Sequence, residues 1–246
     1  ALTHPNFRLE FADEAYVFIE RDNPSPLILP DFKPTSAWKA QWTLLDRKDV
    51  SIVGRLDRFF AQFILGDVQI IVGKQVIATG VGQIFTAVSQ VQRYLFDFID
   101  PEFPKTEDAV SLIWAGPLQL EARFLPKASD QREQNFHLRA KGNKNNFDFA
   151  LTTGKSDDKF YLGLETAGNI GDGLIRGELV GYDAKNKDYL QGLLGFDYVF
   201  SAKWSGKAEL FYNGFGRAGD YVFEIFPHRT APFRGQWYGA LLLTWE

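Results

Sequence analysis

Side chains of opposite charge stand two residues apart at four points of this sequence. These charged pairs are the residues with which the protein could bind or select a solute. The pairs are Arg55/Asp57, Glu121/Arg123, Arg176/Glu178 and Lys207/Glu209. Residues i and i+2 of an extended chain share one face, so each pair projects to one side of a strand. In an enclosed, water-filled space such charges select solutes by charge and size. The alternative, a packed interior held by salt bridges, remains open at this point.

Other polar residues extend this set of candidate lumen positions, and none of them indicates catalysis. Cysteine is absent, and the three histidines are far apart with no H-E-x-x-H motif, so no catalytic residue, metal site or cofactor is expected. We interpret His137 as lining a lumen, because no partner for a catalytic base stands near it. The candidate lumen-lining and selectivity residues are Arg55, Asp57, Lys74, Glu121, Arg123, His137, Arg139, Arg176, Glu178, Lys207 and Glu209.

Two glycine motifs resemble parts of nucleotide-binding loops, but each is incomplete. Gly73-Lys74-Gln75 lacks the rest of a phosphate loop, and Gly80-Val81-Gly82 lacks the third glycine of a dinucleotide fingerprint. We expect these glycines instead to allow sharp bending where a strand turns inward.

The elements that must position the charges are strands, because apolar and polar residues alternate along most of the chain. Residues 117–125 are the clearest case: Leu118, Leu120, Ala122 and Phe124 share one face and Gln119, Glu121 and Arg123 the other. The same period, with turn-forming residues between segments, predicts about eleven or twelve strands. The main ones are residues 37–46, 50–65, 68–77, 108–114, 117–125, 135–141, 146–152, 159–166, 174–182, 190–200, 204–213 and 236–245.

Three N-terminal regions are less regular. Residues 7–20 alternate only partly, so a helix is possible there. Residues 22–34 hold four prolines and indicate a long loop. Within residues 80–94, Ile84, Val88 and Val91 have helical spacing, which indicates a short helix near 82–94 or a plug segment.

Composition excludes several classes of protein. The net charge is −4 with both signs interspersed, so no nucleic-acid surface is expected. No apolar run is long enough for a transmembrane helix. No change in composition divides the chain, which predicts a single domain over residues 1–246. Because methionine is absent, we expect Ala1 to follow the removal of a signal peptide or the trimming of other N-terminal residues.

Aromatic residues favour a membrane-spanning barrel over a soluble one. They make up 15% of the chain, and many Trp and Tyr residues fall near strand ends, as in the girdles at membrane–water interfaces. A membrane barrel turns its apolar face outward, whereas a soluble barrel turns it inward. The expected interface aromatics are Trp38, Trp114, Tyr198, Trp204, Tyr212, Trp237 and Trp245.

Residues 72–85, V-G-K-Q-V-I-A-T-G-V-G-Q-I-F, resemble the G-R-Q-x-I-x-W-G segment of a family of bacterial porin-like outer-membrane β-barrels. Asp108-Ala109-Val110-Ser111-Leu112 is similar to the D-A-V-x-L strand that follows it, although Lys74 stands where the family has Arg. The likeness covers residues 50–216. It implies an antiparallel up-and-down transmembrane barrel in the bacterial outer membrane.

The leading hypothesis is therefore an outer-membrane pore, not an enzyme, for passive or facilitated passage of small polar solutes. Its partners would be membrane lipid or detergent and the solute, with no nucleic acid. Two alternatives remain: a structural or plugged outer-membrane barrel, and a soluble β-barrel that binds an apolar ligand.

Overall fold

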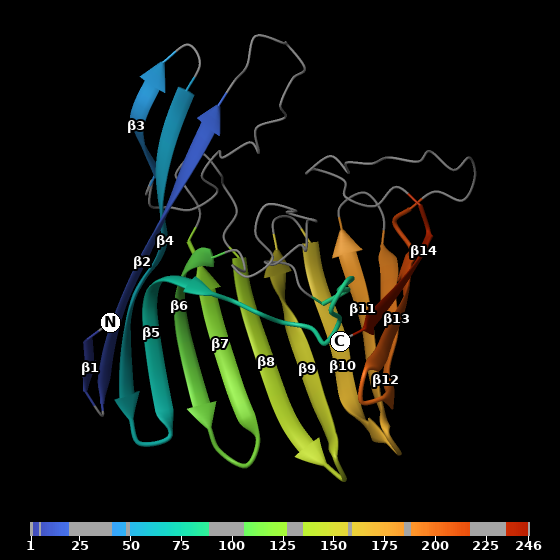
Figure 1. Ribbon diagram of the computed structural model, residues 1–246. Helices are drawn as coiled ribbons and strands as arrows, with labels where there is room; N and C mark the ends of the chain where they lie inside the picture. The colour runs from blue at the N-terminus through green and yellow to red at the C-terminus, as the bar shows by residue number, and fades with distance from the viewer. Residues whose placement is uncertain are drawn as a thin grey trace.

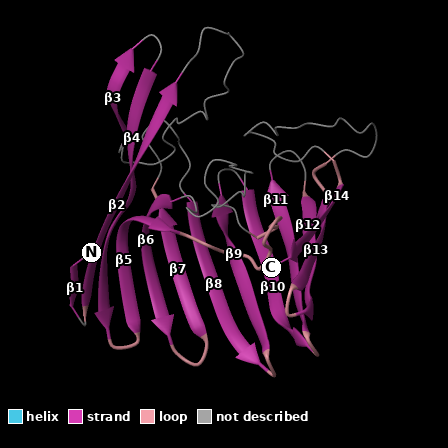
Figure 2. Cartoon of the chain, in the orientation of Figure 1, coloured by secondary structure: helices cyan, strands magenta, loops and turns pink. Residues whose placement is uncertain are grey.

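A computed structural model describes residues 2–4, 6–19, 41–47, 50–88, 106–126, 135–156, 159–184, 188–216 and 235–245. The regular elements of these residues are all strands, drawn in magenta in Figure 2. Their bounds are β1 Leu2–His4, β2 Phe7–Ile19, β3 Gln41–Arg47, β4 Val50–Leu65, β5 Val68–Val76, β6 Thr106–Ala115, β7 Gln119–Leu125, β8 Asn135–Lys144, β9 Phe147–Ser156, β10 Lys159–Ile170, β11 Gly173–Ala184, β12 Tyr189–Ser201, β13 Trp204–Asn213 and β14 Trp237–Trp245.

These strands form one sheet in which neighbours along the chain pair antiparallel. The order runs from β1 through β2, β4 and β5 to β14, and β3 lies off this path against β4. The expected all-β, antiparallel, up-and-down architecture is confirmed. Fourteen strands are described where about twelve were expected, partly because β1 is only three residues long and escapes a periodicity search. Residues 7–20, where a helix was possible, form β2.

Short turns join the strands at one end of the sheet, drawn at the bottom of Figure 1. Asn145 and Asn146, between β8 and β9, both have positive φ (54° and 63°), as the two central residues of a type I′ hairpin turn require. Gly66 and Gly171 supply positive φ in two further turns. These turns fix the register, and with it the side of the sheet to which each residue points.

Apolar side chains cover one face of the sheet, here called the outer face. They belong to alternate residues of successive strands and are 41–65% exposed. Examples are Phe63, Leu65, Val72, Val110, Leu112, Leu120, Phe124, Leu138, Phe149, Leu151, Leu162, Leu164, Leu179, Leu194, Phe196 and Leu210. The opposite, inner face carries buried charged residues such as Glu121, Glu165 and Arg176. This distribution is the reverse of that in a soluble barrel.

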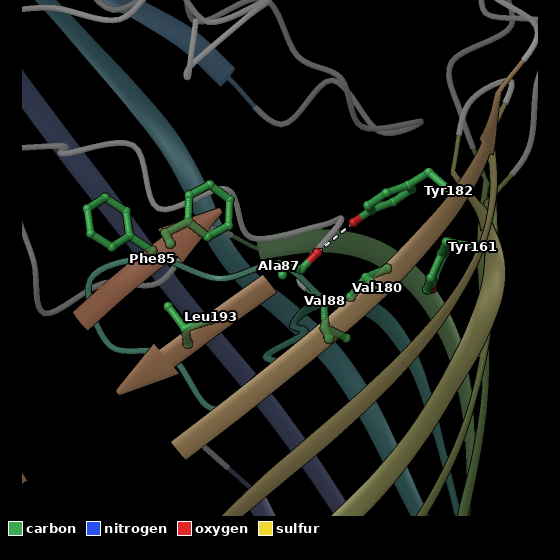
Figure 3. Packing of buried hydrophobic residues seen from close by; sticks show 8 residues of the cluster. Phe85, Ala87, Val88, Tyr161, Val180, Tyr182 and Leu193 are labelled. Atoms are coloured by element: carbon green, nitrogen blue, oxygen red, sulfur yellow. Dashed lines mark hydrogen bonds between the residues drawn. The ribbon is translucent and has the colours of Figure 1, made fainter. Parts of the chain in front are cut away.

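Residues 77–88 leave the end of β5 and cross in front of the inner face, as Figure 1 shows in teal. We call these residues the inner segment. Phe85, Ala87 and Val88 pack with Tyr161, Val180, Tyr182, Leu193 and Phe211 in the main buried apolar cluster (Figure 3). The Phe85 and Phe211 rings stack with centroids 5.6 Å apart. The segment therefore lies on the inner face of β10–β13.

The helix expected near residues 82–94 is not present in the described part, which ends at Val88. The amides of the inner segment bond to side chains of the sheet instead of to carbonyls four residues earlier in the chain. The spacing of Ile84 and Val88 therefore reflects docking on the inner face, where both side chains pack in or against the buried apolar cluster.

Within the described ranges, no helix is long and apolar enough to cross a bilayer. No pairing within those ranges joins β14 to β1 or β2.

Candidate functional site

Three glutamates on the inner face hold the inner segment by its backbone. Glu165 of β10, Glu178 of β11 and Glu209 of β13 are all buried. Together they accept hydrogen bonds from eight backbone N–H groups between Gly80 and Val88. Hydrogen bonds to an ionised acceptor are among the strong ones in proteins. The segment is thus fixed to the wall by charge-assisted bonds as well as by apolar packing.

Glu178 is the most heavily used acceptor. Its Oε1 accepts from the amides of Val81 (2.6 Å) and Gly82 (2.7 Å), and its Oε2 from the amides of Ala87 (2.6 Å) and Val88 (3.0 Å) and from Thr86 Oγ1 (3.0 Å). A carboxylate offers about four lone-pair sites, so five donors saturate it.

Glu209 and Glu165 accept hydrogen bonds from other amides of the segment. Glu209 accepts from the amides of Gln83 (2.7 Å), Ile84 (2.9 Å) and Phe85 (2.8 Å). Glu165 accepts from the Gly80 amide (3.1 Å) and from Thr152 Oγ1 (2.8 Å).

Glu165 and Glu178 stand directly opposite each other in the β10–β11 register. Like charges in this position repel and destabilise a sheet. The donors of the inner segment and the guanidinium of Arg139, whose Nη2 lies 2.6 Å from Glu165 Oε2, offset this repulsion. The wall and the segment therefore stabilise each other.

Two glycines let the segment approach the wall. Gly80 has φ +91°, and a Cβ there would lie 2.8 Å from Glu178 Oε1. A Cβ on Gly82 would lie 1.7 Å from the carbonyl oxygen of Phe85. A side chain fits at neither position, which agrees with the sharp inward bend that the sequence predicts.

Arg176 of β11 lies beneath the segment, and its side chain is 3% exposed. Its Nη1 lies 2.6 Å from Glu209 Oε1 and also donates to the Val81 carbonyl oxygen (3.2 Å). Its Nη2 bonds to Asp197 of β12. The register places Gly195 between Arg176 and Glu209, so no side chain blocks the ion pair. Arg176 therefore joins two carboxylates and the segment.

On β7 and β8 the inner charges pair with one another along the wall. Arg123 Nη2 lies 2.6 Å from Glu121 Oε2, and Arg139 Nη1 lies 3.8 Å from Glu121 Oε1. Arg139 reaches Glu165 across β9. The chain of charges thus runs from β7 to β10.

His137 of β8 is buried, and its Nδ1 shares a hydrogen bond with the Tyr161 hydroxyl of β10. Gly154 of β9 lies between them in the register, and a Cβ there would lie 2.9 Å from the Tyr161 oxygen. The missing side chain on β9 makes this contact possible. Among the residues that the structure describes, no group of three or more His, Cys, Asp or Glu could hold a metal ion.

The remaining candidate lumen residues differ in burial and in the groups that they contact. Lys74 is buried with its Nζ 3.9 Å from Asp108 Oδ1. Lys207, half-buried on β13, donates from Nζ to Gln83 Oε1 of the inner segment (2.7 Å). The side chains of Arg55 and Asp57 lie outside the described residues.

Three of the four sequence pairs have described side chains, and in one of these three the two residues form an ion pair with each other. Glu121 and Arg123 bond to each other. Arg176 bonds to Glu209 and Asp197, while Glu178 bonds to the segment. Lys207 also bonds to the segment. The charges therefore connect across strands more than along them.

The expected interface aromatics gather at the two ends of the sheet. Trp114, Tyr198, Trp204 and Trp245 lie at the end with the short turns, where the rings of Trp204 and Trp245 stack at 6.1 Å. Tyr212 and Trp237 lie at the opposite end with ring centroids 4.8 Å apart. Trp38 lies outside the described residues.

Sequence reasoning missed Glu165, Asp197, Tyr182 and the amides of the inner segment as parts of the site. Alternation places both acidic residues on the inner face, so that signal was available. Inward-facing glycines such as Gly154 and Gly195 also mark points where side chains reach across a strand. The backbone N–H donors could not be predicted in this way, because nearly every residue type carries one.

Comparisons with known proteins agree with this geometry at the level of the fold. The structure is similar to outer-membrane expressed OmpT of Vibrio cholerae, with a TM-score of 0.51 and 13% identity over 86% of this chain and 77% of that one. A variant of that protein lacking loop L8 matches with a TM-score of 0.52 and 13% identity over 84% and 82%. The chain has the fold of an outer-membrane β-barrel.

Sequence comparisons add no family. No family model matches the chain, and no curated protein matches its sequence. The resemblance of residues 72–85 to porin-like proteins therefore stays a prediction.

Proposed function

We propose that this protein is an outer-membrane pore that passes small polar solutes through a charged lumen. The observation that carries the proposal is the division of the sheet into two faces. Leucine and phenylalanine cover the outer face, and the inner face holds a connected set of charges with a segment lying across it. An apolar exterior suits lipid, and a charged, narrowed interior suits selection of solutes in water.

The same division disfavours the soluble alternative. A soluble barrel that binds an apolar ligand would turn its leucines and phenylalanines inward, but here they are exposed. The outer-membrane location is supported by this exterior, by aromatic residues at both ends of the sheet and by the likeness to an outer-membrane protein.

An arginine scan of the outer face tests whether it meets lipid. Leu164 lies in the middle of β10 and Ile170 at its end, and both are exposed on the outer face. Leu164→Arg should lower the free energy of unfolding from lipid vesicles by about 2–4 kcal/mol, and Ile170→Arg by about 0–1 kcal/mol. Denaturant titration measures both values. Equal costs at the two positions would contradict a membrane around β10.

A plugged barrel is the second candidate, because the inner segment crosses in front of a wall whose charges already pair with one another. Planar-bilayer recording of the wild type and Glu178→Gln separates the two candidates. A pore gives single-channel steps in the wild type. A plug gives steps only in the variant, where an amide nitrogen would face segment N–H groups and loosen the segment. Silence from both folded proteins would overturn the pore.

A further inference from the structure

We infer that Lys207 is the charge that solutes contact in the lumen, and that the preferred solute is a small organic anion. This inference rests on the proposed pore and deepens it by naming the solute class. Lys207 lies on the inner face of β13, and its Nζ donates to Gln83 Oε1 at 2.7 Å. Gln83 is exposed on the inner segment. The pair thus stands where the segment and the wall meet solvent.

The partner of Lys207 distinguishes it from the other cations near the segment. Each of those binds a carboxylate in the described part of the chain: Arg176 binds Glu209 and Asp197, Arg139 binds Glu165, and Arg123 binds Glu121. Lys207 instead binds a neutral amide oxygen, that of Gln83. An ammonium has three N–H donors, so two remain for a solute or water.

Asp197, the carboxylate nearest to Lys207 in the register, is directed elsewhere. It stands opposite Lys207 in the β12–β13 pair, but its Oδ1 binds Arg176. Its Oδ2 lies 3.4 Å from Gln83 Nε2. The charge of Asp197 is therefore shared with a buried guanidinium, and the ammonium of Lys207 keeps its positive field toward the lumen.

The glutamates around the segment are screened from solutes, and Asp197, whose side chain is 17% exposed, is paired with Arg176. The side chains of Glu165 and Glu209 are 1% and 0% exposed. Both of them, like Glu178, accept hydrogen bonds from the backbone N–H groups of the segment. In the described part of the chain, Lys207 and Gln83 stand at the solvent-facing side of the segment, next to these screened carboxylates. A carboxylate or phosphate group accepts hydrogen bonds from an ammonium, which identifies the solute class.

Zero-current potentials in planar bilayers test the inference, with a potassium chloride gradient and then a potassium acetate gradient. The wild type should favour the anion in both salts. Lys207→Gln should lower the anion-to-cation permeability ratio about threefold, because one charge is lost within several ångströms of the ion path. Lys207→Arg should keep the wild-type ratio. Lys203→Gln is the matched control, since it removes the same charge from the exposed β12–β13 turn.

The outcomes separate this inference from the pore itself. Absence of conductance overturns the pore and the inference together. Conductance that favours cations in the wild type, or a ratio that Lys207→Gln leaves unchanged, overturns the inference alone. An equal loss in Lys203→Gln would assign the effect to net charge and would likewise overturn it.

Discussion

The inner face has two walls that use the same residue types differently. On β7 and β8, Glu121 bonds to arginines, and its charge is offset by neighbouring side chains. On β11 and β13, Glu178 and Glu209 bond mainly to the amides of the inner segment. The charges of the first wall form ion pairs within the sheet, whereas those of the second also bond to a segment from elsewhere in the chain.

The difference shows that apolar–polar alternation along a strand determines the face to which a charged side chain points but not the group to which it bonds. Glu121 and Glu178 occupy equivalent inward positions on their strands. Their roles diverge because the inner segment reaches only the second wall, and a carboxylate left without donors in that place would be costly. The wall of β10–β13 is therefore built to receive a segment, and perturbing it should move the segment.

Replacing one arginine in each wall is expected to give the largest contrast. Arg176→Gln leaves Glu209 and Asp197 without their cation and should lower the free energy of unfolding by about 3–5 kcal/mol. Arg123→Gln should cost about 1 kcal/mol, because Glu121 keeps Arg139 nearby. Denaturant unfolding of both variants in detergent measures the contrast. Equal losses would mean that the two walls do not differ in their dependence on arginine.

Two glycine substitutions sharpen the comparison next. Gly82→Ala places a Cβ 1.7 Å from the Phe85 carbonyl oxygen and should displace the segment at a cost of about 1–3 kcal/mol. Hydrogen exchange of the amides of residues 83–88 should then become faster. Gly181→Ala is the control, since nothing lies within 4 Å of its Cβ. Slow exchange in Gly82→Ala would show that the segment does not need this close approach.

The sheet was predictable from the sequence because period-two alternation and turn residues repeat from strand to strand. In β11 and β13, the side of each residue follows from its neighbours, so Arg176, Glu178 and Glu209 could be assigned to one face. The partners of those charges could not be assigned. They depend on strand register and on glycines, such as Gly195, that leave room across a strand.

The inner segment was the hardest part to predict. The spacing of Ile84 and Val88 also fits a helix, and local sequence does not reveal that the amides bond to Glu178 and Glu209, ninety or more residues away. Those bonds join backbone groups, which every residue carries, to side chains far along the chain. Only Gly80 and Gly82 gave a local sign of the bend.

The smallest expected effect comes from two tyrosine hydroxyls of the β10–β13 wall, one of which bonds to the inner segment and the other to β8 of the opposite wall. Tyr182 donates from its hydroxyl to the Ala87 carbonyl oxygen at 2.5 Å, whereas the Tyr161 hydroxyl contacts His137. Tyr182→Phe should weaken the segment by one hydrogen bond, about 1 kcal/mol, and speed exchange of the Ala87 and Val88 amides about fivefold. Tyr161→Phe should leave those amides unchanged. If both variants speed exchange equally, the segment is coupled to the whole inner face, and the division into two walls is wrong.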